Sequence, residues 1–86
     1  MAAAILKFKS VKPYTMAVLE TRNGNGGAPV KSEEVIVEKR DQLRITLLTD
    51  SGSFGLDANS VDATVFTSRY HPDVTFRLRT VEENVA

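Results

Sequence analysis

The sequence predicts an all-β protein: a single antiparallel sheet, sandwich or small barrel of five to seven strands, with little or no helix. Three observations support this fold class. Apolar and polar residues alternate with a period of two in several segments, as in "DVTFRLRT" (73–80), where Val74, Phe76 and Leu78 share one side. Turn-forming residues such as those of "DSGS" and "RYHPD" separate the segments. Signals for a helix are almost absent before the last residues of the chain.

The size and charge of the chain restrict its function. Its 86 residues are 42% hydrophobic and 26% charged, which fits one globular domain, residues 1–86. Eleven Lys plus Arg balance eleven Asp plus Glu, so any polyanionic partner must meet a local patch. No cysteine is present, which excludes disulfides, thiolate ligands and a cysteine nucleophile.

The first 21 residues of the chain contain two expected strands. In "LKFK" (6–9), Leu6 and Phe8 would point inward while Lys7 and Lys9 point to solvent. The segment "YTMAVLET" (14–21) is apolar on both faces from Met16 onward, which favours a central or doubly covered strand. Exposed strand edges together with this two-sided strand would favour self-association.

The glycine-rich segment "TRNGNGGAPV" (21–30) raises the question of a phosphate-binding loop. Such a loop needs a following helix and, in the P-loop, a lysine, but here Ala28, Pro29 and Val30 follow the glycines. The Asn-Gly pairs are instead typical of hairpin turns. We therefore predict a flexible hairpin loop over 22–32, between a strand ending near Thr21 and one beginning near Glu33.

The second half contains the remaining strands. "EEVIVEK" (33–39) predicts one strand, "QLRITLLT" (42–49) another, and "VDATVFT" (61–67) a fifth or sixth. The inward positions expected in the last two are Leu43, Ile45, Leu47, Val61, Ala63 and Val65. "SFGLDANSV" (53–61) is the weakest segment, since Gly55 would suit a bulge and the segment an excursion from the sheet.

The end of the chain carries a helix-start signal. Thr80 and Glu83 have capping-box spacing, with acids in the first turn. We predict an acidic tail or an aborted helix start over 81–86.

The sequence offers no convincing catalytic or metal site. His71 is the only histidine and precedes Pro72 in a turn, and no nucleophile is placed beside it by spacing. Adjacent acids such as Glu33 and Glu34 point apart on a strand, so they suit solvated charges better than a catalytic dyad. We therefore expect no enzyme activity, no cofactor and no metal ligands.

Charge placement gives the best candidate for a binding surface. Cations occupy outward positions of three expected strands, with threonines between them. If these strands were neighbours, they would form a basic sheet face suited to phosphate contacts and hydroxyl hydrogen bonds. The alternative is that the cations only solvate the sheet and protect its edges. The candidate nucleic-acid-binding residues are Lys7, Lys9, Arg44, Thr46, Thr75, Arg77 and Arg79.

The segment "TSRYHPDVTFRLRTVEENVA" resembles the closing strand and first helical turn of single-stranded RNA bacteriophage coat proteins, and "VEKRDQLRITLL" is compatible with their middle strands. The resemblance implies a sheet that dimerises edge to edge, a basic face that meets an RNA hairpin, and another face covered by helices. This sequence reaches Ala86 before such helices would form. A second resemblance, to the small single-strand-binding proteins of filamentous phages, rests on length and the all-β pattern.

Two hypotheses for function follow. The first is a non-enzymatic binding or assembly module whose basic sheet face contacts RNA or single-stranded DNA, in its specific form a self-associating coat-type subunit, dimeric or larger. The second is a protein-interaction module or inhibitor that uses an edge strand or the glycine-rich loop, without nucleic acid. No apolar run reaches the roughly 18 residues of a membrane helix, and lysines interrupt the N-terminal segment before a signal peptide could form. An intracellular (cytoplasmic) or virion protein that does not enter membranes is expected.

Overall fold

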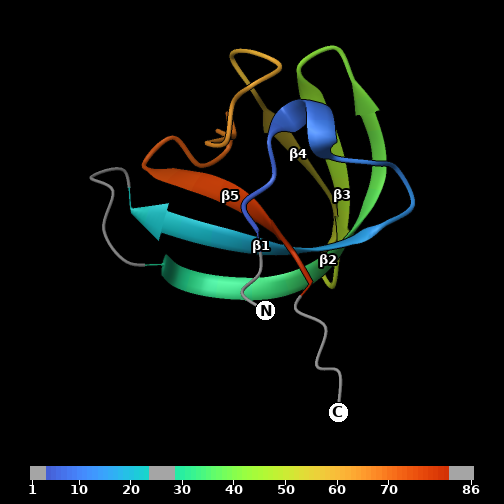
Figure 1. The fold of residues 1–86 in the computed structure, drawn as a ribbon. Helices are drawn as coiled ribbons and strands as arrows, with labels where there is room; N and C mark the ends of the chain where they lie inside the picture. Colours follow the sequence, from blue (N-terminus) through green and yellow to red (C-terminus); the bar gives the residue numbers. More distant parts are fainter. Residues whose placement is uncertain (1–3, 24–28, 82–86) are drawn as a thin grey trace.

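The predicted fold class is confirmed. A computed structural model describes residues 4–23 and 29–81 of the chain. These residues form one antiparallel sheet of five strands in the order β4-β3-β2-β1-β5 (Figure 1), preceded by a short 3-10 turn. The elements are η1 (Phe8–Ser10), β1 (Met16–Asn23), β2 (Pro29–Asp41), β3 (Arg44–Thr49), β4 (Gly52–Asp57) and β5 (Val74–Thr80).

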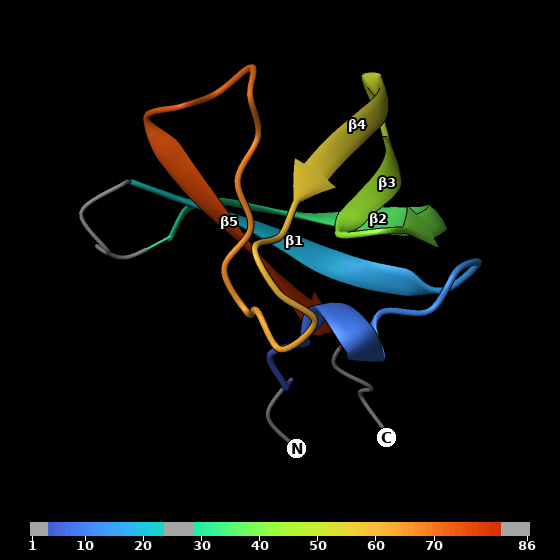
Figure 2. The same ribbon diagram turned by 90° about the horizontal axis from the view of Figure 1, so that it is seen from above.

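The strands from β1 to β4 form a meander, and β5 returns to lie beside β1. The return is made by residues 58–73, called the crossover below, which pass close to η1 before they reach β5 (Figure 2). A meander closed by a strand that returns beside the first strand is the Greek-key arrangement. As the sequence predicts for 14–21, β1 is an interior strand, paired with β2 on one side and β5 on the other.

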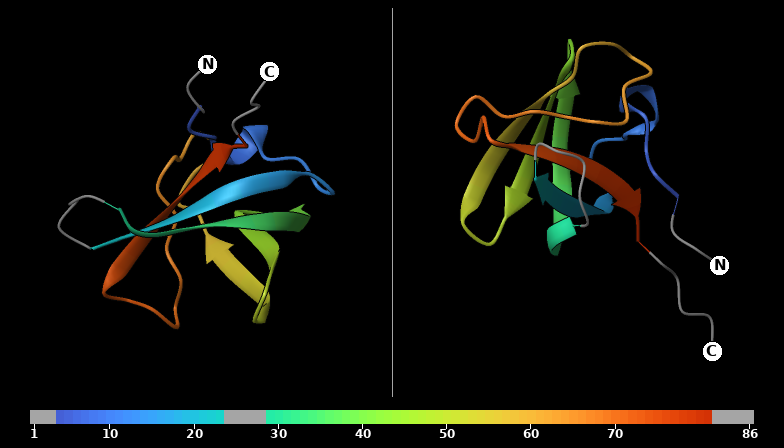
Figure 3. Two further views of the ribbon diagram at one scale, coloured as in Figure 1. Left: turned by 90° about the horizontal axis from the view of Figure 1, so that it is seen from below. Right: turned by 90° about the vertical axis from the view of Figure 1, so that its left-hand side faces the viewer.

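The crossover also joins the two outer strands of the sheet. Phe66 exchanges two backbone hydrogen bonds with Phe76 of β5 (2.8 and 2.9 Å), and Thr67 exchanges two with Asp57 of β4 (2.7 and 3.0 Å). The Leu6 N–H donates to the Leu78 carbonyl oxygen at 2.8 Å. The twisted sheet therefore curls into a small, nearly closed barrel (Figure 3). The expectation of exposed edges is wrong for β5, because neighbouring backbone covers its outer edge.

The core fills the inside of this curled sheet. Alternation places Ile45 and Leu47 of β3 inward, together with Phe76 and Leu78 of β5, as predicted. Each strand except β4 contributes two buried apolar residues, and η1 and the crossover close the inside. The buried apolar residues are Phe8, Val11, Ala17, Leu19, Val35, Val37, Ile45, Leu47, Leu56, Phe66, Phe76 and Leu78. We call this side of the sheet the inner face and the solvent side the outer face.

The strand expected at 6–9 is not formed. Phe8 is buried as predicted, but it begins the 3-10 turn, and its N–H donates to the Ala63 carbonyl oxygen at 2.9 Å instead of to a strand. The Arg40 guanidinium donates to the Phe8 and Lys9 carbonyl oxygens at 3.1 and 2.7 Å. The Phe8 carbonyl oxygen also accepts from the Val11 N–H within the turn at 3.2 Å, so Arg40 adds a second donor there and supplies a donor to the carbonyl oxygen of Lys9. The alternation therefore identifies Phe8 correctly as a buried residue, but it predicts a strand where the chain forms a 3-10 turn.

Two of the three inward positions expected in 61–67 are also wrong, and the third, Ala63, is half-buried. Val61 and Val65 are exposed, whereas Phe66 is fully buried. Only isolated bridges at Phe66 and Thr67 connect this segment to the sheet, so no extended pairing imposes a two-residue alternation. Leu43 is likewise not inward: it lies in the β2–β3 turn with a φ of 55°, and this left-handed backbone directs it away from the core.

The structure also differs from the predictions for the segment 53–61 and for the hairpin loop over 22–32. The segment 53–61 supplies most of β4, and Gly55 pairs regularly with Thr46 without a bulge. The hairpin between β1 and β2 is tighter than predicted, since pairing continues to Thr21–Lys31 and, after a register shift, Arg22–Pro29. Residues 24–28 of the predicted loop and 82–86 of the predicted tail lie outside the described residues.

Candidate functional site

The seven candidate nucleic-acid-binding residues do not converge on one surface. Arg44 and Thr46 lie on the outer face of β3, whereas Thr75, Arg77 and Arg79 lie on the outer face of β5. Two strands, β2 and β1, separate these groups. The condition that the three basic segments be neighbouring strands is therefore not met.

Lys7 and Lys9 lie apart from both groups. Lys7 is exposed just before η1, and Lys9 lies within that turn. The Lys9 ammonium forms an ion pair with Asp62 of the crossover at 2.8 Å. The hydrogen bond and charge of Lys9 lower the pKa of the Asp62 carboxyl. Lys9 therefore already has a counter-charge on the crossover.

The cation on β3 is also paired. Arg44 Nε donates to Asp57 Oδ1 of β4 at 2.9 Å. Thr46 is half-buried between Lys39 of β2 and Gly55 of β4, and Lys39 pairs with Asp41 at 3.2 Å. On this half of the outer face, each of these cations thus faces one acid.

The other half of the outer face carries an excess of positive charge. Arg22 of β1 and Arg77 and Arg79 of β5 surround the single carboxylate of Glu20; we call these three residues the arginine cluster. Arg79 Nη1 donates to Glu20 Oε2 at 2.6 Å, and Arg22 Nη2 donates to Oε1 at 3.0 Å. Among the described residues, these three guanidinium groups lie around one buried carboxylate, and Glu34 of β2 is a further acid on the same face. The sequence motif that predicted Arg77 and Arg79 did not include Arg22 or Glu20.

Glu20 organises this cluster. Its side chain is only 2% exposed although it lies on the outer face, because long arginine side chains cover it. Burial alone would raise the pKa of Glu20, but hydrogen bonds from Arg79 and Arg22, and their charges, outweigh burial and lower it. The carboxylate is therefore ionised and holds two of the arginines in place.

Arg77 is the member of the cluster that forms no ion pair with Glu20. It lies directly opposite Glu20 in the β1–β5 register, yet within the described part of the chain no carboxylate forms an ion pair with it. The Nε–H groups of Arg77 and Arg79 are buried and have no acceptor among the described residues. An unsatisfied buried donor is costly, about 1–3 kcal/mol. Thr75, half-buried opposite Arg22, adds a hydroxyl beside the cluster.

An apolar row crosses the same outer face. Met16, Ile36 and Leu48 are direct partners on β1, β2 and β3. Their exposed fractions are 53%, 42% and 42%. The interior position of β1 was predicted correctly, but its outer face is open at Met16, so the strand is not covered on both faces.

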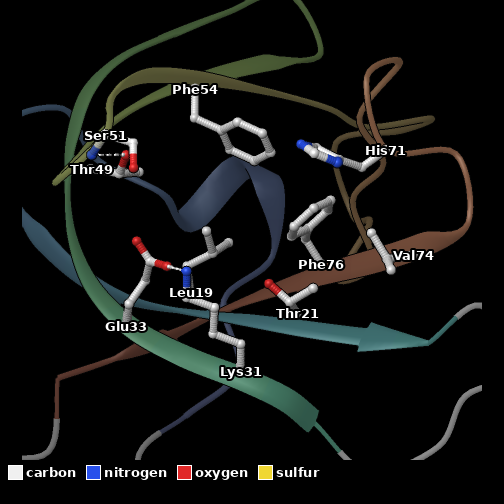
Figure 4. Close-up of a pocket in the computed structure, with 10 residues that line it drawn as sticks. All are labelled: Leu19, Thr21, Lys31, Glu33, Thr49, Ser51, Phe54, His71, Val74 and Phe76. Atoms are coloured by element: carbon white, nitrogen blue, oxygen red, sulfur yellow. Dashed lines mark hydrogen bonds and ion pairs between the residues drawn. The ribbon is translucent and has the colours of Figure 1, made fainter.

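A pocket opens on the inner face at the end of the barrel nearest the β1–β2 hairpin (Figure 4). We call it the mouth pocket. Its volume is about 330 Å³, near the lower end of the roughly 300–1,000 Å³ typical of ligand sites. Phe54, His71 and Phe76 form one wall, with ring centroids 5.3 to 6.5 Å apart. Opposite them, Lys31 and Glu33 form an ion pair at 2.9 Å.

Sequence reasoning missed the mouth pocket, although one signal pointed to it. Lys31 and Glu33 share the alternation phase of Val35 and Val37, which are buried, so the two charges belong to the inner face of β2. His71 does lie in a turn, as predicted, since its N–H donates to the Ser68 carbonyl oxygen at 3.1 Å. Its approach to Phe54 depends on the path of the crossover, which no local pattern indicates.

Neither a metal site nor a membrane helix is found in the described ranges. Residues 4–23 and 29–81 contain no group of three His, Asp or Glu side chains placed to bind a metal ion together. No helix in the same ranges has the length and apolar character needed to cross a membrane. Comparisons of the chain with protein-family models, with curated proteins and with solved structures give no match.

Proposed function

We propose that this chain is a non-enzymatic binding module that contacts single-stranded nucleic acid, RNA or DNA, through the arginine cluster on β1 and β5. The observation that carries the proposal is the ratio of charges. Lys9, Lys39 and Arg44 each face one acid, whereas in the described part of the chain no carboxylate forms an ion pair with Arg77, which lies opposite the carboxylate that Arg79 and Arg22 already bind. Phosphate oxygens would supply the acceptors and negative charge that this surface lacks.

The geometry of the cluster supports phosphate binding in two further ways. The ion pairs to Glu20 fix the guanidinium groups of Arg22 and Arg79 before a ligand arrives, which reduces the entropy lost on binding. Arg77 lies between Arg79 and Thr75 on the same face of β5 and has no competing carboxylate among the described residues.

We predict that Arg77→Ala weakens binding to a short fluorescent single-stranded RNA roughly fivefold or more and reduces the slope of log affinity against log salt by about one unit. The reason is the loss of one phosphate contact. Fluorescence anisotropy across a salt series measures both quantities.

Arg44→Ala is the matched control, because Arg44 lies on the same outer face but is paired with Asp57. This variant should retain nearly wild-type affinity and slope. The proposal is wrong if the wild-type chain does not bind at low salt, or if the two variants lose affinity equally.

Self-association is a second candidate function, supported by the apolar row. Three large side chains aligned across three strands leave a continuous apolar surface in water, and such surfaces often mark interfaces. Backbone covers the outer edge of β5, so a contact between faces would bury more apolar area than a contact at that edge. A two-fold contact would place the row of one copy against the row of the other.

We predict that Ile36→Lys shifts the chain toward a monomer of 9.4 kDa, because it places a charge at the centre of the row. Sedimentation equilibrium over a range of concentrations measures the shift. Val61→Lys is the control, since Val61 is as exposed as Met16 but belongs to the crossover. A wild-type chain that stays at 9.4 kDa at high concentration would exclude this function.

A further inference from the structure

The mouth pocket combines two surfaces that suit different parts of one ligand. Phe54 and His71 face the opening with ring centroids 5.7 Å apart, and Phe76 packs edge-on against Phe54 at 5.3 Å (Figure 4). An aromatic wall of this kind favours a planar ring, which gains stacking energy against it. The buried side chain of Leu19 adds an apolar floor.

The opposite side of the pocket presents a donor and an acceptor side by side. Lys31 Nζ lies 2.9 Å from Glu33 Oε2. The ammonium keeps further N–H groups, and the carboxylate keeps a second oxygen, for a ligand. The hydrogen bond from Lys31 to Glu33 raises the pKa of Lys31, so the ammonium stays charged at neutral pH.

The pair also makes this side electrically balanced. A ligand with a large net charge at this edge would meet both an attractive and a repulsive group, so a neutral group with donors and acceptors fits better. A ring edge with two adjacent donors and a neighbouring acceptor would engage both oxygens of Glu33 and the ammonium of Lys31, whereas an edge with a single donor would engage only one of the two oxygens.

Guanine has such an edge. Its N1–H and N2–H groups are adjacent donors that one carboxylate accepts together, and its O6 is an acceptor beside them. Adenine and cytosine place a ring-nitrogen acceptor next to their amino group, which a carboxylate would repel. Uracil has one N–H between two carbonyl oxygens. We propose that the mouth pocket binds a guanine base, stacked on the Phe54–His71 wall and held by Glu33 and Lys31.

The pocket lies on the inner face, whereas the arginine cluster lies on the outer face of the same strands. Guanine binding therefore goes beyond the proposed phosphate contacts and does not depend on them. The guanine can come from a free nucleotide or from a single-stranded nucleic acid, and both present the same base edge.

Isothermal titration with guanosine, adenosine, cytidine and uridine monophosphates tests the proposal. The wild-type chain should bind the guanosine nucleotide roughly tenfold or more tightly than the others. Glu33→Gln should abolish this preference, while Glu34→Gln, which alters the neighbouring outward residue of β2, should retain it. Lys31→Met serves as a second variant and should weaken guanosine binding without changing the fold, as judged by circular dichroism.

A parallel titration with short oligonucleotides that contain or lack guanine identifies the source of the base. Guanine-dependent binding of the oligonucleotide, with little affinity for the free nucleotide, indicates a strand as the source; similar binding of both indicates a nucleotide site. Equal affinity for the four nucleotides, a preference that survives Glu33→Gln, or no guanine-dependent binding in either format overturns the proposal. Arg77→Ala should leave nucleotide binding unchanged, which separates this test from that of the arginine cluster.

Discussion

Replacing Phe66 by Ala should lower the free energy of unfolding by about 3–5 kcal/mol, a large share of the roughly 5–15 kcal/mol that a small domain has. Phe66 is fully buried although it belongs to no strand. Its ring fills the inside of the barrel, and its backbone exchanges hydrogen bonds with Phe76 at 2.8 and 2.9 Å. Truncation leaves a cavity at the point where the crossover joins the sheet. Urea denaturation followed by circular dichroism measures the effect.

Val65→Ala is the control for Phe66→Ala, because the two residues are adjacent and Val65 is 39% exposed. We expect this variant to lose less than about 1 kcal/mol. The strand that the sequence predicts over 61–67 would place Val65 inward and Phe66 outward, and would therefore reverse the order of the two effects. Equal losses, or a larger loss for Val65→Ala, would contradict the described path of the crossover.

Glu20→Gln should destabilise the protein by about 3 kcal/mol. The substitution preserves the shape of the side chain but removes the charge that Arg22 and Arg79 bind. The expected loss is at the lower end of the range for buried ion pairs, because the arginine side chains are 20% and 37% exposed. Glu34→Gln, an exposed position on the same outer face of β2, should cost less than about 0.5 kcal/mol.

The pH dependence of stability tests the ion pairs of Glu20 in a second way. Because folding lowers the pKa of Glu20, its contribution is complete above the pKa of the unfolded carboxyl, about 4.3. The contribution is then lost as the pH falls through the lower pKa of the folded state. Glu20→Gln should therefore flatten the decline of stability in acid, and a decline identical to that of the wild type would contradict the described ion pairs.

The same variant separates stability from function. Glu20→Gln removes the only acid bound to the arginine cluster among the described residues, so the local positive charge rises. Where the variant remains folded, its binding to single-stranded RNA should depend more steeply on salt than that of the wild type.

The strands could be predicted from the sequence where a strand pairs along its length with a neighbouring strand and only one of its faces meets the core. In β5, Phe76 and Leu78 alternate with Arg77 and Arg79, and the structure confirms their sides. The same holds for Ile45 in β3. Regular pairing imposes a period of two on the side chains, which is why local pattern was sufficient there.

The path of the crossover could not be predicted, because this segment does not pair regularly with a neighbouring strand. Its two bridges, at Phe66 and Thr67, connect to different strands, so burial there depends on contacts distant in sequence. The short turn at Phe8 has the same origin, since its backbone bonds to Ala63. In both segments the alternation predicts a strand, although no neighbouring strand is available to pair along its length.

The same contrast between local pattern and contacts distant in sequence applies to the candidate sites. Arg77 and Arg79 could be named from alternation, but their association with Arg22 and Glu20 required the β1–β5 pairing, which joins segments almost sixty residues apart. The mouth pocket likewise unites Lys31 of β2 with His71 of the crossover. Strand order therefore decides which charges lie together in the arginine cluster and which form separate ion pairs.

The most direct test of the account is to titrate the ¹⁵N-labelled chain with a short single-stranded RNA at low salt and follow its amide signals by NMR. The proposal for the arginine cluster predicts the largest shifts at Arg22 and along Thr75 to Arg79, with small shifts at Arg44, and their reversal as salt is added. Shifts concentrated on β3 and β4, or no shifts at low salt, would contradict the claim that this face binds nucleic acid.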